Sequence, residues 1–113
     1  MAECIFCKIV KGEIPCKKAY EDDRVLAIYD INPVAPVHVL VMPKEHIVNM
    51  AAINDDQMDL VGHIHGVIRN LARELNLNAG YRIVNNCGPQ GGQTVDHLHF
   101  HLLGGRSFAW PPG

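Results

Sequence analysis

The sequence predicts an α+β fold: an antiparallel sheet packed against one long helix, with a second, short helix near the N-terminus. Two observations indicate this class. One stretch, from about residue 55 to residue 75, carries apolar residues at helical spacing, and short apolar or alternating runs bounded by turn residues lie on both sides of it. The chain has 113 residues, a length that suits one core, so we expect residues 1–113 to form a single domain.

The elements expected before the long helix are short and end at recognisable breakers. Gly12 ends the first of them, and the acidic run 21–23 is typical of a turn between two strands. Pro36 and Pro43 bound the third strand, because proline cannot donate a ladder hydrogen bond. The predicted elements are a helix over residues 5–11 and strands over residues 17–20, 24–30 and 37–42.

The long helix has the clearest pattern. Asn54 is placed to cap its N-terminus, with Gln57 three residues on as in a capping box. Apolar residues three and four apart form a stripe that predicts burial against the sheet. The stripe consists of Leu60, Val61, Ile64, Val67, Ile68, Leu71, Ala72 and Leu75. Two further strands are expected after the helix, over residues 81–86 and 97–103, joined by the loop 87–94.

Composition and charge argue against several classes of protein. The chain has 10 Lys and Arg against 12 Asp and Glu, a formal charge of −2, and so lacks the basic excess of a general nucleic-acid binder. No apolar run is long enough to cross a bilayer, and residues 1–20 lack the continuous apolar block of a signal peptide. We therefore expect a cytoplasmic protein whose four cysteines stay as thiols or bind metal.

Histidine and apolar residues alternate between residues 96 and 103. Side chains on a strand alternate between its faces, so the predicted strand places His97, His99 and His101 on one face and their apolar neighbours in the core. Successive histidines on that face would lie about 7 Å apart, because a strand rises about 3.3 Å per residue. Three imidazoles at this spacing indicate a functional site more than a solvated strand face.

Two chemistries are open to such a cluster. Neutral imidazoles are common zinc ligands, and two of them could bind one metal with a further ligand from elsewhere. Alternatively, one imidazole is a nucleophile whose neighbours orient it and transfer protons, since imidazole titrates near pH 6.5. The preceding loop favours this second chemistry. Gly88, Gly91 and Gly92 allow backbone N–H groups to approach an anion, and the side chains of Asn86 and Thr94 add hydrogen bonds.

Four segments of the chain resemble the histidine-triad (HIT) family, and in particular its nucleoside-phosphoramidase branch of bacterial type. The most specific is His-x-His-x-His at residues 97–101, within Gly91–Gly105. The others are Ile5–Pro15, Pro36–Ile47 and Gly104–Gly113, so the resemblance covers nearly the whole chain. It implies a HIT-like fold and a homodimer in which the tail around Trp110 reaches toward the partner's site.

The resemblance also implies an activity, the hydrolysis of purine nucleoside 5′-phosphoramidates or related nucleotidyl substrates at the P–N bond. His99 would attack the α-phosphorus to form a nucleotidyl-histidine, which water then cleaves. His101 would contact the phosphate and help to protonate the departing amine, and His97 and His38 would complete the histidine cluster. Imidazole attack divides one difficult hydrolysis into two easier steps.

The same resemblance assigns binding residues. Asn86 and Thr94 fall where the family binds phosphate, and Asp30 matches the carboxylate that holds the ribose hydroxyls. The positions that match the base pocket are Ile5, Phe6, Ile9, Ile28, Tyr29 and Ile31. Two positions depart from the usual pattern: Thr94 replaces a more common serine, and Asp96, often apolar or aromatic in relatives, is expected to face solvent.

Cys4 and Cys7 form a Cys-x-x-Cys pair. On a short helix both thiols would lie on one side, suited to a tetrahedral metal with two further ligands, although redox pairs use the same spacing. By resemblance to zinc-binding members of the family, the two further ligands would be His46 and His97. We expect such a zinc to be structural, with no cofactor required for the chemistry.

Two other functions fit the same residues. A zinc-dependent hydrolase would use the triad itself as its metal site, and a non-catalytic module would bind nucleotide without turnover. Chelation would abolish the activity of the first, and the second would show no activity.

Overall fold

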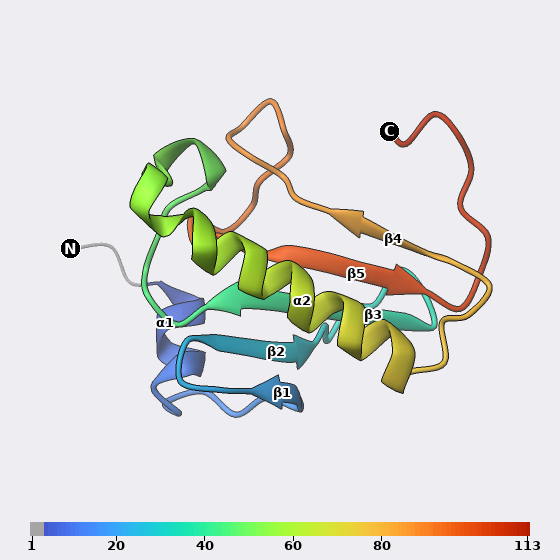
Figure 1. The fold of residues 1–113 in the computed structure, drawn as a ribbon, viewed down its shortest axis with the longest axis horizontal. Coiled ribbons are helices and arrows are strands. Elements are labelled where there is room, and N and C mark those ends of the chain that lie inside the picture. The colour runs from blue at the N-terminus through green and yellow to red at the C-terminus, as the bar shows by residue number, and fades with distance from the viewer. Residues whose placement is uncertain (1–3) are drawn as a thin grey trace.

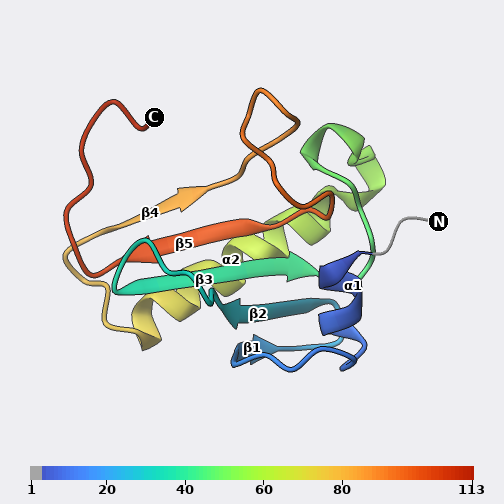
Figure 2. The ribbon, with the colours of Figure 1, turned by 180° about the vertical axis from the view of Figure 1, so that it is seen from behind.

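The computed structural model describes residues 4–113 and contains a five-stranded antiparallel sheet with a helix on each face (Figures 1 and 2). The strand order is β1-β2-β3-β5-β4, and every neighbouring pair is antiparallel. The α+β class predicted from the sequence is confirmed. The helices are α1 (Ile5–Val10) and α2 (Met58–Glu74), and the strands are β1 (Lys18–Glu21), β2 (Val25–Tyr29), β3 (Val37–Pro43), β4 (Tyr81–Val84) and β5 (Phe100–Gly104).

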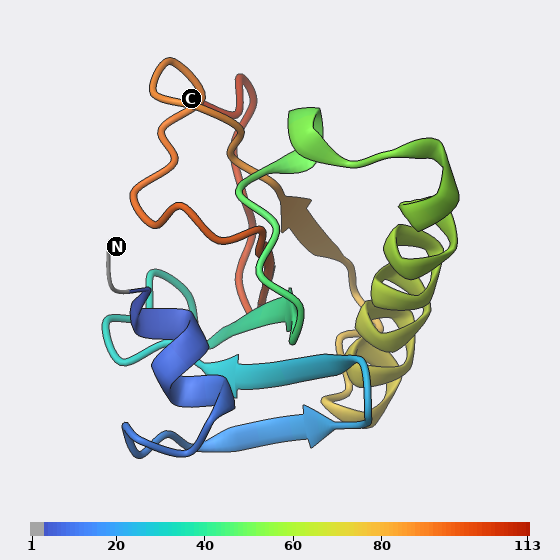
Figure 3. The same ribbon diagram turned by 90° about the vertical axis from the view of Figure 1, so that its left-hand side faces the viewer.

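The two central strands β2 and β3 are buried on both faces because a helix covers each face of the sheet (Figure 3). Side chains alternate between two apolar clusters: Val25 and Ala27 pack toward α2, whereas Leu26 and Ile28 pack toward α1. This explains why both strands read as continuous apolar runs in the sequence. The α2 cluster is the larger of the two and contains most of the core.

The long helix begins three residues later than predicted. Residues Asp55–Gln57 form a short 3₁₀ turn, η2, before α2 starts at Met58, and a second such turn, η1, spans Met50–Ala52. The predicted cap is present in part, since the Gln57 side chain accepts a hydrogen bond of 2.9 Å from the backbone N–H of Asn54. The predicted apolar stripe of α2 is buried from Leu60 to Ala72.

The strand predicted over residues 97–103 was wrong at its N-terminal end, because β5 begins only at Phe100. In the register of the β3–β5 pair Phe100 lies opposite Val41, and two residues further Leu98 would meet Pro43, which has no N–H to donate. The N–H of Leu98 bonds instead to the carbonyl of Ile47, over 2.7 Å. The strand predicted over residues 81–86 is likewise shorter, ending at Val84.

The strand β4 lies at the edge of the sheet, and no other strand among residues 4–113 pairs with its outer side. Tyr81 and Ile83 of this strand are exposed. Among the described residues, no helix is both long and apolar enough to cross a membrane.

Candidate active site and metal-ligand cluster

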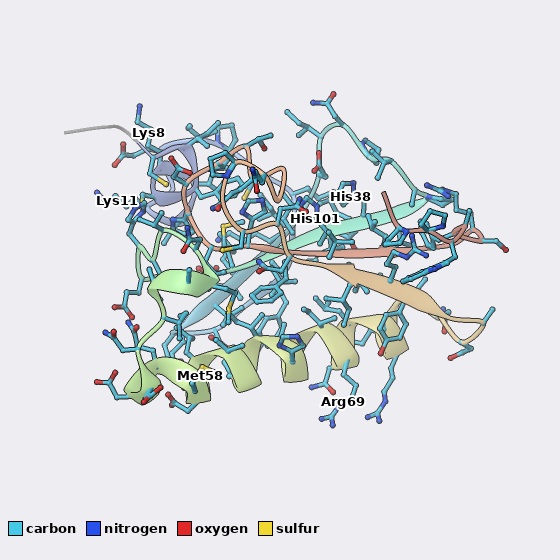
Figure 4. The ribbon with its side chains drawn as sticks, turned by 90° about the horizontal axis from the view of Figure 1, so that it is seen from above. Lys8, Lys11, His38, Met58, Arg69 and His101 are labelled. Carbon is cyan, nitrogen blue, oxygen red and sulfur yellow. The ribbon has the colours of Figure 1, made fainter. Side chains whose placement is uncertain are left out.

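The histidine segment keeps two distinct faces although only His101 lies within a strand. The apolar residues of the segment belong to the cluster under α2. The rings of His97 and His99 lie on the other face and both meet the ring of Phe6 edge-on, at centroid distances of 5.8 and 5.0 Å. Figure 4 shows His38 and His101 side by side on this same face, away from the helix that carries Met58 and Arg69.

The hydrogen bonds of His99 determine its tautomer. Its Nδ1 lies 2.7 Å from the carbonyl oxygen of His97, and since a carbonyl can only accept, Nδ1 carries the proton. The other ring nitrogen, Nε2, therefore has a free lone pair. The Asn85 side chain donates to the carbonyl of His99 over 2.9 Å, so the backbone of this buried residue is held as well.

His38 and His101 form a second pair with the opposite protonation pattern. The backbone N–H of Val34 donates to Nδ1 of His38 over 3.2 Å, so the His38 proton resides on Nε2. From there it is donated to Nδ1 of His101, 2.9 Å away, which leaves the proton of His101 on its own Nε2. The ring centroids of His101 and His99 are 5.2 Å apart. The ring with the free lone pair therefore lies next to the ring that carries the proton donor.

Both members of this pair are neutral near pH 7. Burial, reinforced by neighbouring His99 and His38, lowers the pKa of His101 to about 4, against a smaller opposing effect of Asp30. Burial also lowers the pKa of His38. A neutral ring can accept at one nitrogen and donate at the other, as acid–base catalysis requires.

Asp30 follows β2 and lies beside the histidine pair. One carboxylate oxygen accepts from the backbone N–H of Asn32 over 2.8 Å, the local turn bond expected before Pro33. The other oxygen is 3.4 Å from Nε2 of His38. The side chains of Asp30, His38 and His101 converge closely enough to hold a metal, but His38 already carries a proton on the nitrogen that would have to ligate. Asp30, His38 and His101 are therefore better suited to hydrogen bonding and proton transfer than to binding a metal.

The loop before the triad is ordered by Gln93. Its amide oxygen accepts from the N–H of Gly88 over 2.9 Å, and its amide nitrogen donates to the carbonyls of Val48 and Val95. A Cβ at Gly91 would lie 2.4 Å from the carbonyl oxygen of Cys87, so only glycine fits there. Thr94, at the end of the loop, is exposed, and Asn86 at its start is half-buried.

The six residues predicted for the base pocket divide into three groups. Phe6, Ile9 and Ile28 are buried in the apolar cluster under α1, and Ile5 and Ile31 are exposed, Ile31 by 90%. The prediction was wrong for Tyr29, which is half-buried against the cluster under α2, because side chains alternate along β2 and position 29 shares the face of Val25 and Ala27. The tail is also open, with Trp110 exposed by 82%, and Asp96 faces solvent as expected.

The cluster of Cys4, Cys7, His46 and His97 brings four ligand atoms together within 4.8 Å of one another. Nδ1 of His97 lies 3.4 and 3.6 Å from the Sγ atoms of Cys4 and Cys7. Nδ1 of His46 lies 3.2 Å from the Sγ of Cys7 and 3.2 Å from Nδ1 of His97. Tetrahedral zinc, with bonds of about 2.3 Å to sulfur and about 2.0 Å to nitrogen, requires ligand atoms roughly 3.3–3.8 Å apart, so the residues fit this metal.

The protonation states of His97 and Cys7 also fit a metal site. Nε2 of the fully buried His97 is 2.8 Å from the carbonyl of Pro43 and must donate to it, so the Nδ1 lone pair faces the cluster. Burial lowers the pKa of His97. Burial and the adjacent Cys4 raise the pKa of the Cys7 thiol, so a cation is needed to favour its thiolate.

The sequence did not predict the groups that fix these tautomers: the carbonyls of Pro43 and His97 and the N–H of Val34. These groups belong to the backbone, which is the same for nearly every residue type, so the sequence does not reveal them. Asn85 and Gln93 could have been suspected, because polar amides beside a glycine-rich loop and a histidine run often bond to backbone.

A separate cavity of about 570 Å³ lies away from the histidines, between the start of β4 and the C-terminal tail. Two arginines stack on the Phe108 ring there, Arg106 at 4.3 Å and Arg82 at 5.2 Å from its centroid. Arg82 also donates to the carbonyl of Ala109 over 2.9 Å. These contacts hold the tail in place, and none of them involves the triad.

Comparison with known proteins gave consistent results. Residues 11–108 match the family model of the HIT domain. A HIT family hydrolase from Legionella pneumophila has the same fold, with a TM-score of 0.96 and 47% identity, covering 98% of this chain and 100% of that one. A histidine triad nucleotide-binding protein from Candida albicans gives a TM-score of 0.82 at 38% identity, covering 96% and 83%. A 14 kDa zinc-binding protein from Zea mays is 46% identical over 111 residues, which are 96% of this chain and 87% of that protein.

Proposed function

The chain belongs to the HIT family, and from this premise we propose that it hydrolyses purine nucleoside 5′-phosphoramidates through a nucleotidyl intermediate on His99. Its fold is that of HIT family hydrolases. The observation that carries the proposal is the pairing of tautomers: the ring of His99, with a free lone pair on Nε2, lies next to the ring of His101, which carries its proton on Nε2. A nucleophile and an acid are thus ready at the same pH.

In the first step Nε2 of His99 attacks the α-phosphorus and a P–Nε2 bond forms. The P–N bond of the substrate breaks and its electron pair stays on nitrogen. Nε2–H of His101 passes its proton to the leaving amine while a proton from solvent replaces it on the His38–His101 pair, so both rings stay neutral. The attacking ring becomes positively charged, and its Nδ1–H bond to the His97 carbonyl stabilises that charge.

In the second step water attacks the same phosphorus and the P–Nε2 bond breaks. The electron pair returns to His99, one proton of the attacking water returns to solvent through His101, and the product is the nucleoside 5′-monophosphate. His38 keeps His101 in the tautomer that both steps need, because its Nε2–H occupies Nδ1 of His101.

The substrate would lie along the α1 face of the sheet. Asp30 would accept the ribose hydroxyls, Asn86 and Thr94 would bind the phosphate, and the loop ordered by Gln93 would present backbone N–H groups. The accessible side chains of the base pocket would be Ile5 and Ile31, supported from beneath by Phe6, Ile9 and Ile28. Tyr29 is left out of this pocket because it packs on the α2 side of the sheet. The name of the relative from Candida albicans supports a nucleotide as ligand.

We also propose a structural zinc on Cys4, Cys7, His46 and His97. The geometry of the ligand atoms and the name of the maize relative support it. When bound, the metal would join α1 to two other segments and would supply no chemistry to the reaction. A reducing, cytoplasmic setting would keep both cysteines available as ligands.

A second copy of the chain is the partner we propose for the free edge of β4. The exposed Tyr81 and Ile83 beside unpaired backbone groups favour pairing with another strand. The protruding Trp110 would then lie near the site of the other subunit. Sedimentation of the purified protein would give a dimer mass, and Ile83→Lys would give a monomer.

The activity is tested by measuring AMP release from adenosine 5′-phosphoramidate, with and without a strong chelator. We expect release that survives chelation, is lost in His99→Ala and is unchanged in His63→Ala, which removes a histidine from α2 outside the site. Loss on chelation from a protein that stays folded would assign the triad to a catalytic metal. Nucleotide binding without release would leave a binding module.

A further inference from the structure

We propose that the metal-ligand cluster positions the nucleophile: ligation of Cys4 and Cys7 clamps α1, so that the Phe6 ring holds His99 with Nε2 facing the substrate. This inference rests on the proposed role of His99. It assigns Phe6 and His97 as positioning residues, acting through His99 and not on the substrate.

The first link runs through His97, whose ring is fixed at both nitrogens. Nε2 donates to the carbonyl of Pro43 over 2.8 Å, and Nδ1 faces the cluster. The residue is fully buried. Its own carbonyl is the acceptor for Nδ1–H of His99, at 2.7 Å. A ligand bond to the side chain of His97 therefore also fixes the backbone group that sets the tautomer of His99.

The second link runs through α1, which has only six residues and is too short to be stable alone. Both cysteines belong to its first turn, where Sγ of Cys4 caps the helix by accepting from the N–H of Cys7 over 3.3 Å. Phe6 lies between them in the chain. Its ring is edge-on to His99, with a centroid distance of 5.0 Å and an interplanar angle of 83°.

The third link is the segment around His46. The carbonyl of Ile47 accepts from the N–H of Leu98 over 2.7 Å, so the residue after one proposed ligand is bonded to the residue after another. The cluster thus joins three segments of chain that are far apart in sequence. His99 lies two residues after His97, and its ring is in edge-on contact with the ring of Phe6.

The test observes His99 directly by nitrogen NMR of protein labelled with ¹⁵N-histidine, its signals identified by their loss in His99→Ala. Zinc-loaded protein should show a single Nδ1–H tautomer. In Cys4→Ser/Cys7→Ser, which can retain the helix cap as a serine, zinc is lost and we expect mixed tautomers. We also expect proton exchange at Nδ1 to be faster by about tenfold, the lower end of the effect that loss of an orienting partner has on affinity or activity at metal sites. Cys16→Ser, which removes a thiol outside the cluster, should match the wild type.

Phe6→Leu tests the contact between Phe6 and His99 without removing the metal. This variant retains all four ligands and an apolar side chain, so zinc content should be unchanged while the His99 signals shift as they do in the double variant. Unchanged His99 signals in Phe6→Leu would overturn the proposal, as would unchanged signals in folded protein that has lost its zinc. A wild-type protein that takes up no zinc would overturn it too. None of these readouts requires turnover, so failure of the proposed activity would appear separately, in the AMP-release assay.

Discussion

His38 donates the proton of its Nε2 to Nδ1 of His101 over 2.9 Å, and the backbone N–H of Val34 leaves it no alternative. One peptide group in the loop between β2 and β3 thereby determines where the proton of His101 resides. The peptide group that fixes the acid of the proposed reaction is therefore two hydrogen bonds away from His101.

His38→Leu should lower kcat by about a hundredfold, the usual worth of a positioned acid. Without the donor, His101 can carry its proton on Nδ1 and no longer presents it to the leaving group. His38→Gln restores an N–H donor and should recover part of the rate. Steady-state kinetics of AMP release would check this. Equal kcat values for the Leu variant and the wild type would contradict the assignment.

Stability should fall as the pH drops from about 6.5 through 4, in part because of His101. Its pKa is about 4 in the folded protein and close to the ordinary imidazole value of about 6.5 when unfolded. Between these values the unfolded chain binds more protons, so the contribution is complete above pH 6.5 and is lost toward pH 4. Urea unfolding of wild type and His101→Asn across this range would test it, since the variant should show a shallower dependence.

Asp22 should matter for stability and not for turnover. Its carboxylate accepts from Tyr20 Oη–H and the N–H groups of Arg24 and Val25, each at 2.8 Å, and from His63 at 2.6 Å. These bonds hold the pKa of Asp22 below its usual range and tie α2 to the β1–β2 turn. We expect Asp22→Ala to lower the free energy of unfolding by about 2 kcal/mol, because the turn loses its acceptor.

The matched control for this turn is the exposed neighbour Asp23. Asp23→Ala should change the urea midpoint little, and both variants should release AMP at the wild-type rate at a temperature where they are folded. A fall in the rate of folded Asp22→Ala would show that the turn communicates with the site.

Gln93→Ala should raise the KM for the phosphoramidate by about tenfold, which corresponds to about 1.4 kcal/mol. The amide holds the loop at Gly88, Val48 and Val95, and without it the N–H groups proposed to face the phosphate are no longer preorganised. Gln90→Ala removes an exposed amide from the same loop and serves as the comparison. Equal KM values for the two variants would remove the loop from phosphate binding.

Sequence reasoning succeeded where side-chain type and period decide the outcome. The alternation around His99 correctly separated a histidine face from an apolar one, because period two follows from extended backbone whether or not a ladder forms. It placed the start of β5 too early, because pairing depends on the opposite strand, and Pro43 cannot donate there. Spacing alone also could not connect Cys7 with His46, which is 39 residues away. That link came from the family resemblance, and the fold brings the two side chains together.

The separation of the two sheet faces has a consequence for protein engineering. Positions 98, 100 and 102 lie under α2 and positions 97, 99 and 101 lie on the opposite side, so neighbouring codons address different properties. Substitutions at the even positions change the packing under α2 and therefore the melting temperature. Substitutions at the odd positions change the histidines of the proposed site and therefore its chemistry. Selection for heat resistance can therefore proceed within five residues of the triad's centre and leave the reacting groups unchanged.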